Sequence, residues 1–121
     1  MVDIDKLERV LIQAACEGRS VTYQQLLAFF GRRVGPGNVR ALCRDLGEVC
    51  DRSRARGEPD LACLVVRKSD GLPGEGFFAA ARDQDGYRGG AEGSDASRYV
   101  DEAQTAAFRY WQKRRPLPDV V

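Results

Sequence analysis

Apolar residues recur at helical spacing in the first part of the chain. They are Ile4, Leu7, Val10, Leu11, Ala14 and Ala15. Spacings of three and four residues place such side chains on one face of an amphipathic helix. Asp3 is suited to cap the start of this helix, and Gly18 is suited to stop it. The pattern therefore predicts a first helix between these two residues.

The segment SVTYQQLLAFFG follows and predicts a second, shorter helix. Thr22 and Gln25 stand three residues apart, as in a capping box, where each side chain bonds the backbone N–H of the other. The helix is expected over Tyr23 to Phe30, with Gly31 as its terminator.

A third helix is predicted after the turn RRVGPG, in which Pro36 stands between two glycines. Asn38 is the expected N-cap. The helix should run to about Arg54 and end before Gly57 and Pro59. Its apolar stripe has the helical pattern and consists of Val39, Leu42, Cys43, Leu46, Val49 and Cys50.

The middle of the chain predicts a β-hairpin. The branched apolar residues of LACLVVR, at 61–67, favour a buried strand. Ser69 to Gly71 fits a tight turn, and Leu72 to Phe78 would return as an irregular edge strand because of Pro73 and two glycines. FFAAAR fits one or two helical turns.

The last part of the chain divides into a loop and a helix. Residues 83–97 are polar and rich in glycine, which is typical of a mobile surface loop. Residues 98–115 are expected to form a C-terminal helix, which Phe108 and Trp111 dock onto the core. Pro116 and Pro118 are expected to end the ordered chain.

This order of elements predicts the fold class: α+β and mainly α, a winged helix-turn-helix with a two-stranded hairpin and an added C-terminal helix. The whole chain, 1–121, is expected to be a single domain with its core in residues 1–82. In such a domain the third helix can enter the major groove of DNA. Many winged helices bind proteins instead, so the fold alone leaves both functions open.

The composition indicates the class of protein and its cellular location. The chain has 121 residues, of which 43% are hydrophobic and 31% are charged, as in ordinary globular proteins. No apolar run has the length of a membrane span, and the charged N-terminus does not resemble a signal peptide. We therefore expect a cytoplasmic protein without a membrane partner.

The residues for metal, cofactor or histidine chemistry are scarce. The four cysteines include no CxxC pair, and the chain has no histidine, so neither a zinc site nor a histidine general base is expected. The stretch Gly71 to Gly76 lacks the spacing of GxGxxG and the GK[ST] of a phosphate-binding loop. We expect no metal and no cofactor.

Positive charge is concentrated locally, although the net charge is only +1. Seven arginines stand between Arg32 and Arg56, against three acidic residues. Such a cluster fits a phosphate-binding surface, and it equally fits a solvated helix face.

Several short motifs resemble one known family. They are Val21-Thr22-Tyr23, Arg40-Ala41-Leu42, Ala62-Cys63-Leu64-Val65-Val66 and Ser69-Asp70-Gly71. In kind and order they resemble the C-terminal DNA-binding domain of alkylguanine-DNA alkyltransferases and of the catalytically inactive alkyltransferase-like proteins. The resemblance extends from Leu7 to Phe78. Where the family has PCHR, this chain has Ala62-Cys63-Leu64-Val65, so Leu64 stands in the place of the activating histidine.

The resemblance implies a non-enzymatic protein that binds double-stranded DNA. Tyr23 would help to rotate a nucleotide out of the stack and Arg40 would fill the gap, whereas the alternative is a half-buried aromatic and a solvated arginine. Cys63 is expected to be a buried structural residue. The residues expected to reach phosphates or base edges are Gln24, Arg32, Arg33, Asn38 and Arg44.

A second hypothesis is a winged-helix adaptor that binds a protein and no DNA. The near-neutral net charge and the additional C-terminal helix favour it. Asp70 and Glu75 would also place acidic groups on the predicted wing, where they would repel phosphates.

Overall fold

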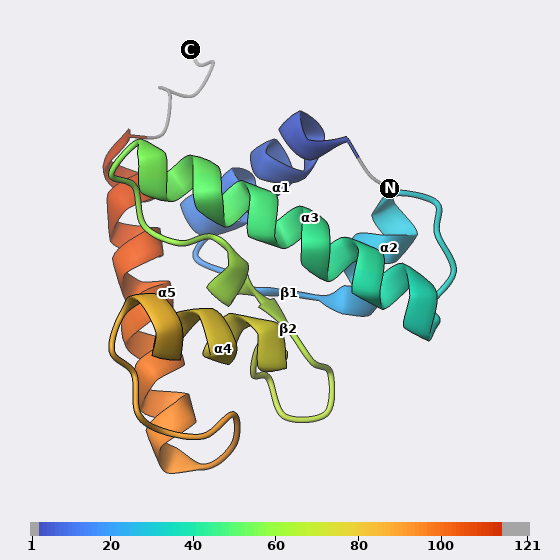
Figure 1. The fold of residues 1–121 in the computed structure, drawn as a ribbon. Helices are drawn as coiled ribbons and strands as arrows, with labels where there is room; N and C mark the ends of the chain where they lie inside the picture. Colours follow the sequence, from blue (N-terminus) through green and yellow to red (C-terminus); the bar gives the residue numbers. More distant parts are fainter. Residues whose placement is uncertain (1–2, 115–121) are drawn as a thin grey trace.

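The structure is a computed structural model that describes residues 3–114 (Figure 1). Its elements are α1 (Ile4–Glu17), β1 (Val21–Thr22), α2 (Tyr23–Phe29), α3 (Pro36–Ala55), the 3-10 helix η1 (Ala62–Leu64), β2 (Val65–Val66), α4 (Glu75–Gln84) and α5 (Ser94–Arg114). The prediction of a mainly helical α+β fold is therefore confirmed.

Both predicted ends of the first helix and the predicted start of the second are confirmed; the second helix ends at Phe29, one residue earlier than predicted. The carboxylate of Asp3 accepts hydrogen bonds from the first turn of α1, and Gly18 ends that helix in the left-handed conformation, with φ of 70°. Thr22 and Gln25 form the complete capping box of α2. These caps depend on residues within one helical turn, which is why the sequence reveals them.

The start of α3 differs from the prediction. Gly35 is the N-cap residue and Pro36 is the first helical residue, a position that suits proline because its missing N–H would have no helical partner there. Asn38 therefore lies inside the first turn and caps nothing. Its Nδ2 donates instead to the backbone oxygen of Arg33, at 2.7 Å, and holds the preceding turn in place.

The predicted hairpin is wrong. The two-stranded sheet pairs β1 with β2 in parallel, with Val21 opposite Val65 and Thr22 opposite Val66. The expected return strand is absent because its second half forms α4. A helix suits this segment since Phe78, which is fully buried, packs in a small second core with residues of α5.

The C-terminal helix is longer than predicted. It begins at Ser94, and α4 extends to Gln84, so that the connecting loop shrinks to residues 85–93. The expectations for Arg115, Pro116 and Pro118 lie outside the described residues. Phe108 and Trp111 pack against the main core, as expected.

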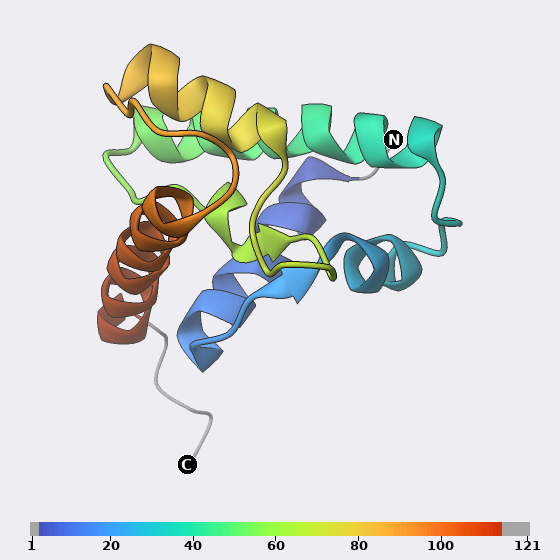
Figure 2. The same ribbon diagram turned by 90° about the horizontal axis from the view of Figure 1, so that it is seen from below.

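The helices surround the small sheet. α5 packs along α1, and Gln104 of α5 donates to the backbone oxygen of Cys63 in η1, at 2.8 Å. α3 and α4 run in the same general direction (Figures 1 and 2). Within residues 3–114, no helix combines the length and apolar character needed to cross a membrane.

Candidate nucleic-acid interface

One continuous segment carries positive charge and no negative charge. Residues 18–44 contain five arginines and neither aspartate nor glutamate. The segment includes β1, α2, the turn after α2 and the first half of α3. The positive end of the α3 helix dipole lies in the same region. Sequence and backbone therefore both contribute positive potential to this part of the surface.

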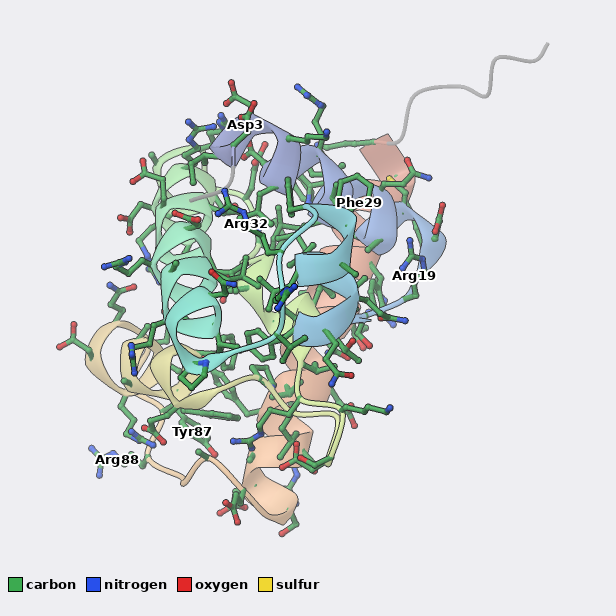
Figure 3. All side chains as sticks on the ribbon, turned by 90° about the vertical axis from the view of Figure 1, so that its right-hand side faces the viewer. Asp3, Arg19, Phe29, Arg32, Tyr87 and Arg88 are labelled. Atoms are coloured by element: carbon green, nitrogen blue, oxygen red, sulfur yellow. The ribbon has the colours of Figure 1, made fainter. Side chains whose placement is uncertain are left out.

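Four of these arginines lie at or after the turn between the two helices. Arg32 and Arg33 are exposed on the turn, and Arg40 and Arg44 are exposed one helical turn apart on α3. In the view of Figure 3, Arg32 lies between α2 and α3. These four residues form what we call the basic face, and they are four of the seven residues predicted to contact DNA.

The other three predicted residues have different roles or positions. Gln24 is exposed in the first turn of α2, and Asn38 is held by the turn. Tyr23 is half-buried, and its hydroxyl accepts a hydrogen bond from the backbone N–H of Gly74 at 3.0 Å. Burial raises the pKa of Tyr23. This hydroxyl therefore joins α2 to the residue that caps α4.

Two large apolar side chains flank the arginines of the turn. Phe29 is 55% exposed and Val34 is 56% exposed. The ammonium group of Lys6 lies over the Phe29 ring, 5.5 Å from its centroid, a distance at which a cation is attracted by an aromatic face. The surface around the turn is thus both cationic and apolar.

A cavity of about 740 Å³ opens between α3, α4 and the segment before η1. This volume is in the range of pockets that hold small molecules. Tyr23 and Phe77 contribute aromatic rings to its lining. The charged residues of the lining are Glu48, Asp51, Glu58, Asp60 and Asp85, with Arg44 and Arg54.

The thiols near the cavity are held as neutral groups. Cys63 is 0% exposed, as predicted, and its Sγ donates to the backbone oxygen of Asp60 at 3.2 Å. The thiol of Cys50 donates to Oδ1 of Asp60 at 2.7 Å. Burial raises the pKa of both thiols, and the nearby Asp60 carboxyl raises each further. Neither thiol is activated as a nucleophile.

Asp60 and Ser53 are the residues of this region that sequence reasoning missed. Each carried a signal in the sequence. Ser53 continues the stripe of Val49 and Cys50 by three residues, so a hydroxyl was to be expected on the buried side of α3. Asp60 directly precedes an apolar run, which places a carboxylate at the edge of the core. Within residues 3–114, no cluster of His, Cys, Asp or Glu is arranged to hold a metal ion.

Comparison with models of protein families, with curated proteins and with solved structures gives no match.

Proposed function

We propose that this chain is a non-enzymatic, alkyltransferase-like DNA-binding protein that uses a helix-turn-helix without the hairpin wing of winged-helix proteins. The observation that carries the proposal is the basic face. Four exposed arginines lie on a helix and on the turn before it, in a segment without a single acidic residue. Arginines and lysines that neutralise phosphates supply much of the affinity of DNA-binding proteins.

We expect the helix that carries the basic face to enter a groove of the DNA. Arg40 and Arg44 are exposed on the N-terminal half of α3, the part that contacts base edges in helix-turn-helix proteins. Arg32 and Arg33 would then contact the flanking phosphates. Under this proposal Arg40 is the residue that would fill the space of a displaced nucleotide.

A short loop takes the place of the absent hairpin wing. Its ends are joined by hydrogen bonds from the Arg67 N–H to the Leu72 oxygen, at 2.8 Å, and from the Gly71 N–H to the Arg67 oxygen, at 2.9 Å. Arg67 also pairs with Asp70 at 2.9 Å, which neutralises the acidic group that would repel DNA. Lys68 remains exposed on this loop.

The proposal includes no covalent step. Cys63 is buried, and burial raises the pKa of its thiol. The next residue is Leu64, at the position where the alkyltransferase family has histidine. A neutral thiol without a base is a poor nucleophile. We therefore expect no adduct on Cys63 after incubation with alkylated DNA.

The test is a fluorescence-anisotropy titration of a labelled DNA duplex at several salt concentrations. We expect binding that weakens steeply with salt, because phosphate contacts release counterions. Replacement of Arg40 and Arg44 by alanine should weaken binding and lower the salt slope by about 1 for each phosphate that is no longer neutralised. Arg98→Ala and Arg109→Ala on α5 remove the same charge outside the basic face and should leave the slope unchanged.

A second function, a protein-binding adaptor, is favoured by the exposed Phe29 and Val34 beside the arginines. Apolar groups in a cationic surround are typical of protein interfaces. The same titration separates the two functions. Absence of salt-sensitive binding, or an equal loss of affinity in the α3 and α5 variants, would contradict DNA binding through the basic face. The protein-binding adaptor would then be the remaining proposal.

A further inference from the structure

The cavity between α3 and α4 contains buried oxygen atoms that have no hydrogen-bond partner. They are Oγ of Ser53 and Oε1 of Glu58, as judged over the part of the chain that the structure describes. Ser53 is only 1% exposed. Buried polar atoms in folded proteins almost always have a partner, so these two oxygens in one cavity wall are suited to accept hydrogen bonds from a bound group.

The arginine near Glu58 does not supply that donor. A guanidinium nitrogen of Arg56 lies 3.8 Å from Oε1 of Glu58, which is beyond hydrogen-bond distance. The same nitrogen donates to Glu8 of α1, at 2.7 Å. Oε1 of Glu58 therefore remains available as an acceptor.

Asp60 adds a third acceptor to the same cavity. Its Oδ1 accepts from the Cys50 thiol and from the Ala62 N–H, at 2.7 and 2.8 Å. Both bonds use one oxygen, so the lone pairs of the second carboxyl oxygen can accept from a ligand. Ser53, Glu58 and Asp60 thus present oxygen acceptors to the cavity.

The charged residues that line the cavity favour a positively charged ligand. Five carboxylates face two arginines around the cavity, and one of those arginines, Arg54, lies 3.6 Å from Asp85. An anion would be repelled, and a cation would be attracted. The rings of Tyr23 and Phe77 also line the cavity, and aromatic faces favour organic cations over strongly hydrated metal ions.

We propose that this cavity binds an organic cation through an ammonium or guanidinium group. Its N–H donors would satisfy Ser53, Glu58 and Asp60, and its alkyl part would lie along Phe77. The cavity shares Arg44 with the basic face. Its acceptors Ser53, Glu58 and Asp60 lie outside the basic face, so the proposal does not rest on DNA binding. The same chemistry is offered by a free polyamine and by an arginine or lysine side chain of a protein, and the test must separate these sources.

The experiment is an NMR titration of the ¹⁵N-labelled full chain with agmatine, which carries both cationic groups. We expect saturable shifts of the Ser53, Glu58 and Asp60 amide signals. 1,5-Pentanediol, an uncharged molecule of similar length, should cause none. A capped arginine peptide forms the second arm, and the tighter ligand of the two identifies the source.

Variants assign the binding to the cavity. Glu58→Gln should weaken agmatine about tenfold or more, as expected for loss of a charged hydrogen bond, and Ser53→Ala should weaken it less. Glu92→Gln removes an exposed carboxylate of the 85–93 loop and should change nothing. The dispersion of each variant's spectrum verifies its fold.

Other outcomes would overturn the proposal. They are shifts that spread over exposed carboxylates without saturation, equal binding of the diol, and unchanged affinity in Glu58→Gln. DNA binding should be unaffected by Glu58→Gln, so failure of this proposal and failure of the DNA proposal are separately visible.

Discussion

At the scale of single residues, Asp60 shows how burial sets the state of a group. Burial is the largest influence on its pKa and raises it, although hydrogen bonds from Cys50 and Ala62 oppose the shift. The carboxyl group is therefore harder to ionise in the folded chain than in the unfolded chain. This property depends on tertiary packing, and the sequence indicates only that a charged residue adjoins an apolar run.

Asp60→Asn should raise the free energy of unfolding at neutral pH. In the wild type, the unfolded carboxyl loses its proton near the ordinary pKa of 3.8, whereas the folded one retains it to a higher pH. Rising pH in that window therefore favours unfolding, up to the folded pKa, above which the penalty is constant. Asparagine keeps an oxygen for both hydrogen bonds and cannot ionise.

Urea unfolding of both proteins from acidic to neutral pH measures the difference. We expect the advantage of the variant to widen as pH rises through the ordinary pKa of 3.8 and then to level off. Asp101→Asn, at an exposed position of α5, controls for the chemistry of the substitution itself. A constant difference at every pH would contradict the raised pKa.

At the scale of elements, the short-range signals of α1 and α2 predicted the structure correctly, whereas the N-cap expected at Asn38 and the mixed signals after Gly71 did not. Asp3, Gly18 and Thr22 act within one turn of helix, and each lies where the sequence placed it. The segment after Gly71 contains Pro73, two glycines and two phenylalanines, which suit an edge strand as well as a loop followed by a helix. The burial of Phe78 against α5 favours the helix. This contact joins segments far apart in the chain, so local sequence patterns do not predict it.

Thr22→Ala should destabilise the chain by about 1 kcal/mol, the usual effect of losing an N-cap side chain. The Thr22 oxygen accepts from the Gln25 N–H at 3.0 Å, and alanine cannot form this bond. Chemical denaturation followed by circular dichroism measures the effect.

Thr105→Ala is the matched control, because Thr105 is exposed within α5 and caps no helix. Alanine has the higher helix propensity, so this variant should be neutral or slightly stabilised. Equal effects of the two substitutions would show that the capping box contributes nothing.

At the scale of the whole molecule, α5 is part of the main core and not an appendage. It packs along α1, and Phe108, Trp111 and Ala103 contact the main cluster of buried residues. Val100 also completes the second cluster around Phe78. Residues of α5 therefore contribute to both clusters of buried residues.

A chain truncated after Gly93 should lose its cooperative fold. The truncation exposes the α1 face that α5 covers, and the apolar area removed from water is the main stabilising contribution in a small domain. We expect collapsed dispersion in the NMR spectrum and a broad thermal transition.

The full chain with Glu102→Gln, an exposed substitution on α5, should retain its spectrum and its sharp transition. A truncated chain with well-dispersed signals would contradict the role assigned to α5.

The sequence by itself determined the caps of α1 and α2, most of the buried stripes, the burial of Cys63 and the concentration of arginines. Each depends on residue type and on neighbours within a few positions. Only the tertiary structure decided the parallel pairing of Val21 with Val65, the helical state of residues 75–84 and the acidic cavity with unpaired oxygens. These features arise from contacts between segments far apart in the chain, whose geometry no local pattern specifies.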